Sequence, residues 1–169
     1  VPAAIKSGAS GIGLYRTAFL FIATGEAPSE QEQFDAYVGA VNALEGRVLT
    51  IRTLDLGADK LLHNPTYSEN NPFLGCRSIR YCLQHLDLFK TQLRAILRAS
   101  AHGPVRIMFP LISNVLELRQ ANMILRDVKE DLEDTGEPFD NDTPVGIMSE
   151  VPSAAIQAAA LAREVDFFS

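Results

Sequence analysis

Three charged side chains occur within or at the ends of apolar runs, where they could meet a ligand. Arg16 lies in GIGLYRTAFLF, Arg52 follows VLTI, and Glu150 ends VGIMSE. A guanidinium group is costly to bury unless it meets an anion. For Arg52 the sequence leaves two partners open. One is a structural ion pair with Asp55 or Asp59, and the other is a ligand anion at the end of the strand.

The three side chains suggest a site for a small, multiply charged phosphate or carboxylate. In α/β sheets and barrels, ligands bind outside the carboxyl ends of the parallel strands. Arg16 and Arg52 suit such an anion because each offers a planar fork of donors. Glu150 would repel the anion unless a divalent cation lay between them. Mg²⁺ commonly takes one or two carboxylates together with substrate oxygens, so it is the expected cofactor.

The elements that position these side chains follow from periodicity. Strand-like runs rich in β-branched residues are predicted near 12–17, 48–53, 105–109 and 145–150, with a further strand from 166. Helical spacing and caps predict helices over 3–7, 29–46, 73–83, 86–100, 114–132 and 153–163. Alternating strands and helices indicate an α/β fold with parallel strands, and periodicity leaves open whether the sheet is open or closed. Residues 54–71 are predicted to form a long loop at the ligand mouth.

Composition narrows the class of partner. The chain has 169 residues, 47% of them hydrophobic, and a formal net charge of −6. An acidic body argues against non-specific binding to nucleic acid or to anionic membranes. No apolar run reaches the length of a membrane span, so no membrane insertion is expected. The first and last residues suggest a segment excised from a longer protein.

The cysteines and histidines show no pattern typical of a metal site or a nucleophile. Cys76 and Cys82 are six residues apart, which matches no common zinc spacing. They are predicted to be structural thiols of a reduced, cytoplasmic protein. The three histidines, His63, His85 and His102, are predicted to be surface or capping residues.

Five stretches of the chain carry a family resemblance. They are GIGLYRTAFLF, TIRTLDLGADK, NPFLGCRSIR, RIMFPLIS and VGIMSEVPSA, which occur in this order over nearly the whole chain. They resemble the phosphoenolpyruvate (PEP)-binding barrel domain of enzyme I, the PEP–protein phosphotransferases of bacterial sugar phosphotransferase systems. Pyruvate phosphate dikinase and PEP synthase are more distant relatives. The resemblance implies a (β/α)₈ TIM barrel, of which residues 1–169 hold about the first half as a single partial domain.

The resemblance also implies a reaction and a set of roles. Enzyme I moves the phosphoryl group of PEP to a histidine in its own N-terminal domain and then to the carrier protein HPr, for sugar uptake. By the same motifs, Arg16 and Arg52 would hold the phosphate, Arg77 would support substrate binding, and Glu150 would be one of two carboxylates on Mg²⁺. The acceptor histidine and the cysteine acid would lie outside residues 1–169, so the resemblance assigns no catalytic residue here. The family is dimeric through this domain, which implies a homo-oligomer.

Two positions depart from the family pattern. Ala18 replaces the usual glutamate after Arg-Thr, which removes an ion pair that would orient a neighbouring arginine. Ser149 replaces the usual Ile or Val before the metal glutamate. Both bear on how well this chain retains the site.

Three hypotheses follow for function. The first is the PEP- and Mg²⁺-binding part of a phosphotransferase, inactive by itself. The second is a barrel that handles pyruvate or oxaloacetate and uses Mg²⁺ for carbon–carbon chemistry. The third is a PEP-sensing or dimerisation module without turnover. A half-barrel has two unpaired sheet edges, so the segment alone is also expected to self-associate.

Overall fold

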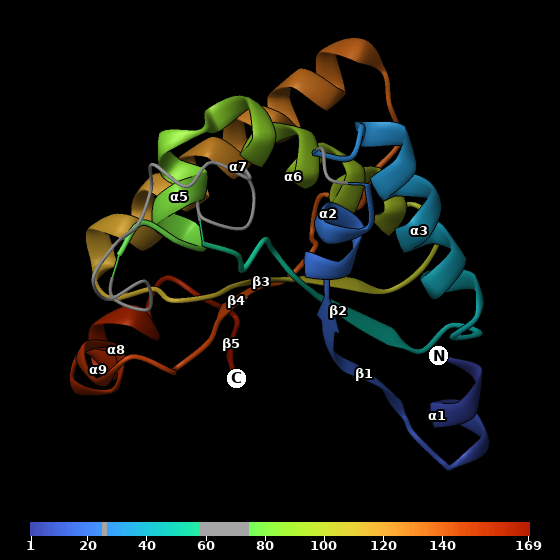
Figure 1. Ribbon diagram of the computed structural model, residues 1–169, viewed down its shortest axis with the longest axis horizontal. Coiled ribbons are helices and arrows are strands. Elements are labelled where there is room, and N and C mark those ends of the chain that lie inside the picture. The colour runs from blue at the N-terminus through green and yellow to red at the C-terminus, as the bar shows by residue number, and fades with distance from the viewer. Residues whose placement is uncertain (25–26, 58–74) are drawn as a thin grey trace.

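A parallel sheet forms the frame of the computed structural model, which describes residues 1–24, 27–57 and 75–169 (Figure 1). Its strands are β1 (Gly11–Arg16), β2 (Val48–Arg52), β3 (Val105–Phe109), β4 (Val145–Ile147) and β5 (Phe167–Phe168). They pair in sequence order, each parallel to the next. Parallel neighbours joined by helical connections build the wall of a barrel, so the chain forms a five-stranded partial barrel of the TIM type.

One helix precedes the first strand, and the others lie in the connections between the strands. They are α1 (Pro2–Lys6), α2 (Ala18–Thr24), α3 (Glu30–Asn42), α5 (Ile79–Gln84), α6 (Leu86–Ser100), α7 (Val115–Thr135), α8 (Pro152–Ile156) and α9 (Ala158–Leu161). In Figure 1, α3, α5, α6 and α7 lie on one side of the strands, and the C-terminus lies on the other.

The predicted caps start the two helices that carry them. At α3, the Ser29 hydroxyl accepts a hydrogen bond from the Glu32 amide at 3.2 Å, and the Glu32 carboxylate accepts one from the Ser29 amide at 2.8 Å. This capping box satisfies two amides that the helix itself leaves unpaired. At α7, Asn114 accepts from the Glu117 amide at 2.9 Å, and Gly136 ends the helix in the left-handed region.

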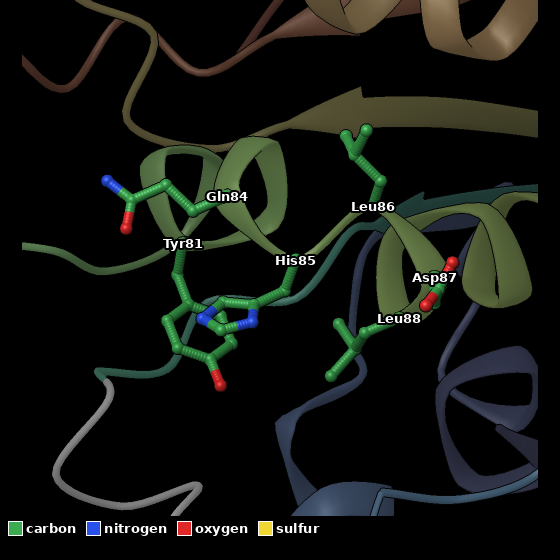
Figure 2. A pocket seen from close by; sticks show the side chains of 6 residues that line it. All are labelled: Tyr81, Gln84, His85, Leu86, Asp87 and Leu88. Carbon is green, nitrogen blue, oxygen red and sulfur yellow. The ribbon is translucent and has the colours of Figure 1, made fainter.

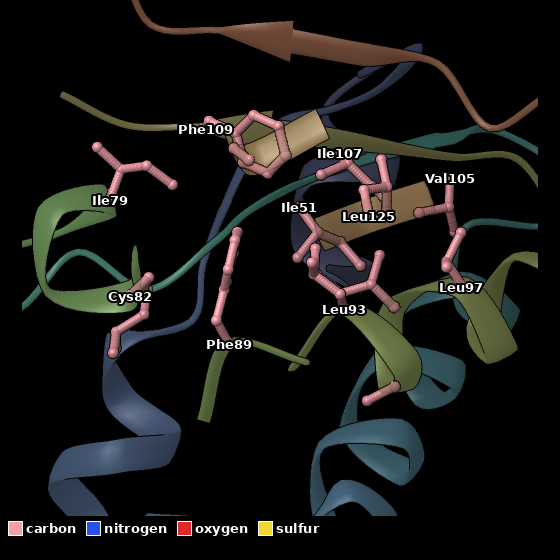
Figure 3. Close-up of a cluster of buried hydrophobic side chains, with 14 of the residues drawn as sticks. Ile51, Ile79, Cys82, Phe89, Leu93, Leu97, Val105, Ile107, Phe109 and Leu125 are labelled. Atoms are coloured by element: carbon pink, nitrogen blue, oxygen red, sulfur yellow. The ribbon is translucent and has the colours of Figure 1, made fainter. Parts of the chain in front are cut away.

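The core fills the space between the sheet and the helices (Figure 3). Ile51 and Ile107 of the sheet are fully buried, as are Phe89 and Leu93 of α6. The rings of Phe89 and Phe109 meet edge to face, with centroids 6.0 Å apart. Burial of each large apolar side chain contributes roughly 1.5–3 kcal/mol, so this layer holds α6 against the sheet. Because side chains alternate along a strand, the intervening residues face the barrel interior.

The structure differs from the predicted elements in three connections. Residues 18–24 form α2, although the sequence predicted no helix after the strand near 12–17, because periodicity cannot separate a short apolar strand-like run from a helical turn. β4 ends at Ile147 rather than at residue 150. The predicted helix 153–163 is two shorter helices that meet at Gln157, whose side chain donates to the Ser113 carbonyl at 3.3 Å.

Two other predictions fall partly on residues that the structure does not describe. The loop 54–71 is described as far as Gly57, so Asp59 and His63 lie outside the described residues. The predicted helix 73–83 appears as α5, which begins at Ile79 after Ser78 adopts a φ of 53°. Among the described helices, none is both long and apolar enough to cross a bilayer.

The tight packing of Gly11 in β1 against Val48 in β2 yields a test of the sheet. A Cβ atom added to Gly11 would lie 2.7 Å from the Val48 carbonyl oxygen, a backbone atom that cannot rotate away. We expect Gly11→Ala to lower the free energy of unfolding by about 1–3 kcal/mol in urea titrations. Gly13→Ala is the control, because a Cβ there meets no described heavy atom within 4 Å. Equal losses in the two variants would contradict this packing.

Candidate functional site

The structure places Arg16 and Arg52 side by side at the carboxyl ends of neighbouring strands. Each ends its strand, and the two residues are Cα partners in the register of β1 and β2. Adjacent strands lie about 4.8 Å apart, so the two side chains leave the sheet from neighbouring points. Arg16 is exposed, whereas Arg52 keeps 8% of its surface in contact with solvent. The two arginines therefore form one positively charged edge, in which the Arg52 side chain is held by its surroundings and the Arg16 side chain is exposed to solvent.

The guanidinium group of Arg52 has an acidic partner at NH1 but no described partner at Nε. Its NH1 group lies 2.9 Å from Asp55 Oδ2 and 3.9 Å from the sulfur of Met148. Of the partners that the sequence left open, Asp55 forms the ion pair. The Nε of Arg52 is buried and has no hydrogen-bond partner among the described residues. A buried donor without an acceptor is costly, so an acceptor oxygen at this nitrogen would stabilise the folded protein.

Asp55 joins Arg52 to Arg77. Arg77 NH2 lies 3.0 Å from Asp55 Oδ1, and the Ser78 hydroxyl donates to the same oxygen. The backbone supports this arrangement, because Gly57 forms a bridge with Arg77 and the Ser78 amide donates to the Leu56 carbonyl at 3.1 Å. Arg77 and Arg52 therefore share the Asp55 carboxylate.

The pKa of Asp55 reflects these contacts. Burial raises the pKa of Asp55. The hydrogen bond from Ser78, the charge of Arg52 and the contacts of Arg77 together lower the pKa by more than burial raises it, so the pKa lies below its ordinary value. Asp55 is therefore ionised throughout the neutral range. The sequence had named it as a possible partner of Arg52 but not as the acceptor shared by Arg52 and Arg77.

Glu150 lies beyond the end of β4 and is exposed. Its Oε1 accepts a hydrogen bond from the Leu111 amide at 2.8 Å, in the turn after β3, where Leu111 has a φ of 54°. In the part of the chain that the structure describes, no group of three or more His, Cys, Asp or Glu side chains could hold a metal ion. Glu150 can offer one carboxylate to a metal, and the other ligands would come from substrate or from elsewhere.

The two departures from the family pattern lie at the edges of the site. Ala18 begins α2 and is half-buried, two residues after Arg16. Ser149 is exposed, and its amide donates to the Ser169 carbonyl at 2.7 Å. Its hydroxyl is therefore not forced into an apolar layer.

The cysteines are free thiols, which excludes a disulfide between them. Cys82 is fully buried, and burial raises its pKa to about 12, which makes the thiol a poor nucleophile. Cys76 donates to Gln84 Oε1 at 3.3 Å. His102 is exposed and meets the Phe34 ring edge to face at 5.6 Å. The described cysteines and this histidine thus fit the structural roles predicted for them.

A separate hollow of about 450 Å³ lies where α5 meets α6 (Figure 2). Within it the rings of Tyr81 and His85 stack, with centroids 4.0 Å apart. The lining residues are Tyr81, Gln84, His85, Leu86, Asp87 and Leu88. The hollow contains neither arginine of the strand ends, so it is distinct from the candidate anion site.

Comparison with known proteins identifies relatives along the whole chain. The sequence model of the PEP-utilising enzymes, PEP-binding domain, matches residues 1–169. A phosphoenolpyruvate-protein phosphotransferase of Staphylococcus aureus (strain MSSA476) is 47% identical over 170 residues, covering 100% of this chain and 30% of the relative. Proteins of the same name from Haemophilus influenzae and Bacillus subtilis are 49% and 46% identical, covering 97% and 100% of this chain and 29% and 30% of their own lengths. The chain thus spans about 30% of the length of these curated relatives.

Asp55→Asn tests the shared carboxylate. Because Arg52 and Arg77 lose a charged acceptor, we expect the free energy of unfolding at pH 7 to fall by about 1.5–3 kcal/mol. The folded-state pKa lies below the ordinary 3.8, so the stabilisation is fully present above that value and is lost as pH falls through the folded pKa. Denaturant titrations at pH 7 and at about pH 3 should therefore show the gap between wild type and variant narrowing in acid.

Asp127→Asn is the matched control. Asp127 lies 3.7 Å from Lys90 with half of its side chain exposed, so its pair should contribute little at either pH. A gap for Asp55→Asn that widened in acid would contradict the assigned ion pair.

Proposed function

Because the chain belongs to the PEP-utilising enzymes and matches their PEP-binding domain, we propose that it binds PEP within a phosphoenolpyruvate–protein phosphotransferase. The observation that carries this proposal is the pairing of Arg16 with Arg52 at the carboxyl ends of β1 and β2. The names of curated relatives at 46–49% identity support the same activity for the complete protein.

In this proposal the phosphate of PEP binds at the edge formed by Arg16 and Arg52. The buried Nε of Arg52 has no acceptor among the described residues, and an anionic oxygen would supply one. Arg16 is exposed and can turn toward the same group. Asp55 takes the NH1 of Arg52, which fixes the plane of the guanidinium and leaves its Nε edge for the ligand. Arg77 supports substrate binding from the other side of Asp55.

Glu150 fits a role as one ligand of Mg²⁺. Its carboxylate is exposed beyond β4, and its bond to the Leu111 amide holds one oxygen in place. Mg²⁺ usually keeps one or two carboxylates and completes its shell with substrate oxygens and water. When bound, the ion would neutralise charge on the oxygens of PEP. The described residues provide a single member of this set, in keeping with further ligands elsewhere in the complete protein.

The proposed reaction breaks the bond between phosphorus and the enol oxygen of PEP. A new bond forms to a nitrogen of an acceptor histidine, and the enolate leaves and is protonated to pyruvate. Cationic side chains stabilise a loose transition state whose charge is spread over the phosphoryl oxygens. We propose that Arg16 and Arg52 do this here, and that the acceptor histidine and the proton donor lie in other parts of the complete protein. The phosphoryl group would then pass to HPr for sugar uptake, in a cytoplasmic homo-oligomer.

Arg52→Lys in the complete protein tests the arginine pair. Lysine keeps the charge but loses the forked donors, so the dissociation constant for PEP should rise roughly 10- to 150-fold, the equivalent of about 1.5–3 kcal/mol. Calorimetric titration with PEP and Mg²⁺ measures the change directly. Arg106→Lys is the control: Arg106 lies near the start of β3 opposite Thr50 of β2, away from the strand ends, and its guanidinium lies 5.5 Å from the centre of the Phe167 ring. If Arg52→Lys bound PEP like wild type, Arg52 would not be part of the site.

Glu150→Gln tests the metal ligand. The amide oxygen can still accept from Leu111, so the turn should be preserved while the charge is removed. We expect the Mg²⁺ concentration for half-maximal PEP binding to rise about tenfold or more, the loss of a charge-assisted contact. Glu130→Gln, on the exposed face of α7, is the control and should leave the Mg²⁺ requirement unchanged. An unchanged requirement in Glu150→Gln would exclude it as a ligand.

A further inference from the structure

A buried amide side chain lies directly behind the two arginines. Gln92 of α6 has no exposed surface, and all of its polar atoms are used. Its Nε2 donates to Thr17 Oγ1 at 3.3 Å and to the Tyr37 hydroxyl at 3.2 Å. Its Oε1 accepts from the Leu54 amide at 2.7 Å. One side chain thus connects α6, α3 and the segments that leave β1 and β2.

Thr17 carries this connection to Arg52 itself. Thr17 follows Arg16 directly and is 1% exposed. Its hydroxyl accepts from Gln92 and donates to the Arg52 carbonyl at 3.1 Å. Leu54, two residues after Arg52, is held by Gln92 on the other side. The backbone on which each arginine stands is therefore tied to the same amide.

The chemistry of the position argues against a role in packing alone. Phe89, Leu93 and Ile96 on the same helix are fully buried and apolar. A buried amide is costly unless every polar atom is paired, and apolar side chains could fill the same volume. The fully satisfied network also lies at the ends of β1 and β2, next to the residues that carry the two guanidinium groups.

We propose that Gln92 and Thr17 are positioning residues that set the spacing between the guanidinium groups of Arg16 and Arg52. This inference rests on the proposed function, in which those two groups hold the phosphate of PEP. Charge-assisted hydrogen bonds to a phosphate depend on the direction of each donor, so a shift of either strand end weakens both contacts. The two arginines hold the phosphoryl group both in bound PEP and in the transition state, so a small shift that weakens their contacts equally in both states raises KM with little change in kcat.

The test uses the complete phosphotransferase and steady-state kinetics with PEP. Gln92→Met keeps the volume but removes the hydrogen bonds, and Thr17→Val replaces the hydroxyl by a methyl group. We expect KM for PEP to rise about five- to tenfold in both, with kcat within about twofold of wild type. Thr17→Ser retains the hydroxyl and should keep KM near wild type. If Gln92→Met does not fold, the Val and Ser variants of Thr17 decide the question.

Ser100→Ala is the matched control on the same helix. Ser100 is 6% exposed, and its hydroxyl donates to the Leu97 carbonyl at 2.5 Å and accepts from the Asp140 amide at 2.8 Å. Its loss should lower the free energy of unfolding while leaving KM for PEP unchanged, because it stands at the far end of α6.

The outcomes separate this inference from the proposed function. An unchanged KM in folded Gln92→Met and Thr17→Val overturns the positioning role while leaving the PEP site intact. An equal rise of KM in Ser100→Ala overturns it too, since general destabilisation would then explain the effect. If the unmodified protein does not bind PEP in calorimetry, both the proposed function and this inference fail.

Discussion

The site depends on one electrostatic constraint, because β1 and β2 bring two guanidinium groups to neighbouring positions at the same edge of the sheet. Two like charges at neighbouring strand ends repel each other, and the repulsion is stronger near a protein surface than in bulk water. The charge of the buried Arg52 is compensated by its ion pair with Asp55, whereas the charge of Arg16 is exposed to water. A bound anion would relieve the remaining repulsion. In the proposed site, PEP therefore gains affinity from a charge arrangement that the free protein only partly compensates.

The backbone behind these charges is held by buried polar contacts. Gln92 ties the segment after β1 to the segment after β2, and Thr17 ties itself to the Arg52 carbonyl. The apolar layer between the sheet and α6 fixes the helix that carries Gln92. Core packing and site geometry are thus connected through a single helix, and the rigid part of the site is backbone whereas the adaptable part is the exposed side chain of Arg16.

The carboxylate proposed to bind metal is separated from the arginine edge by β3. Glu150 follows β4, and its contact with the Leu111 amide joins the turns that leave β3 and β4. The sulfur of Met148, two residues before Glu150, lies 3.9 Å from the NH1 group of Arg52. This separation places opposite charges at different strand ends of one sheet edge.

The sequence by itself determined what depends on neighbouring residues. Periodicity and caps predicted the bounds of β3 and α6, the start of α7 and the parallel order of the strands, but they missed α2. The sequence also singled out Arg16, Arg52 and Glu150 as charged residues at predicted strand ends. The tertiary structure decided what depends on residues far apart in the chain. It made Arg16 and Arg52 register partners and made Asp55 the acceptor that Arg52 shares with Arg77. It also brought Gln92 into contact with Thr17, although the two residues are 75 positions apart in the chain. A glutamine in an apolar helix gives no local signal of its partners, because hydrogen bonds between distant segments exist only once the sheet and helices have packed.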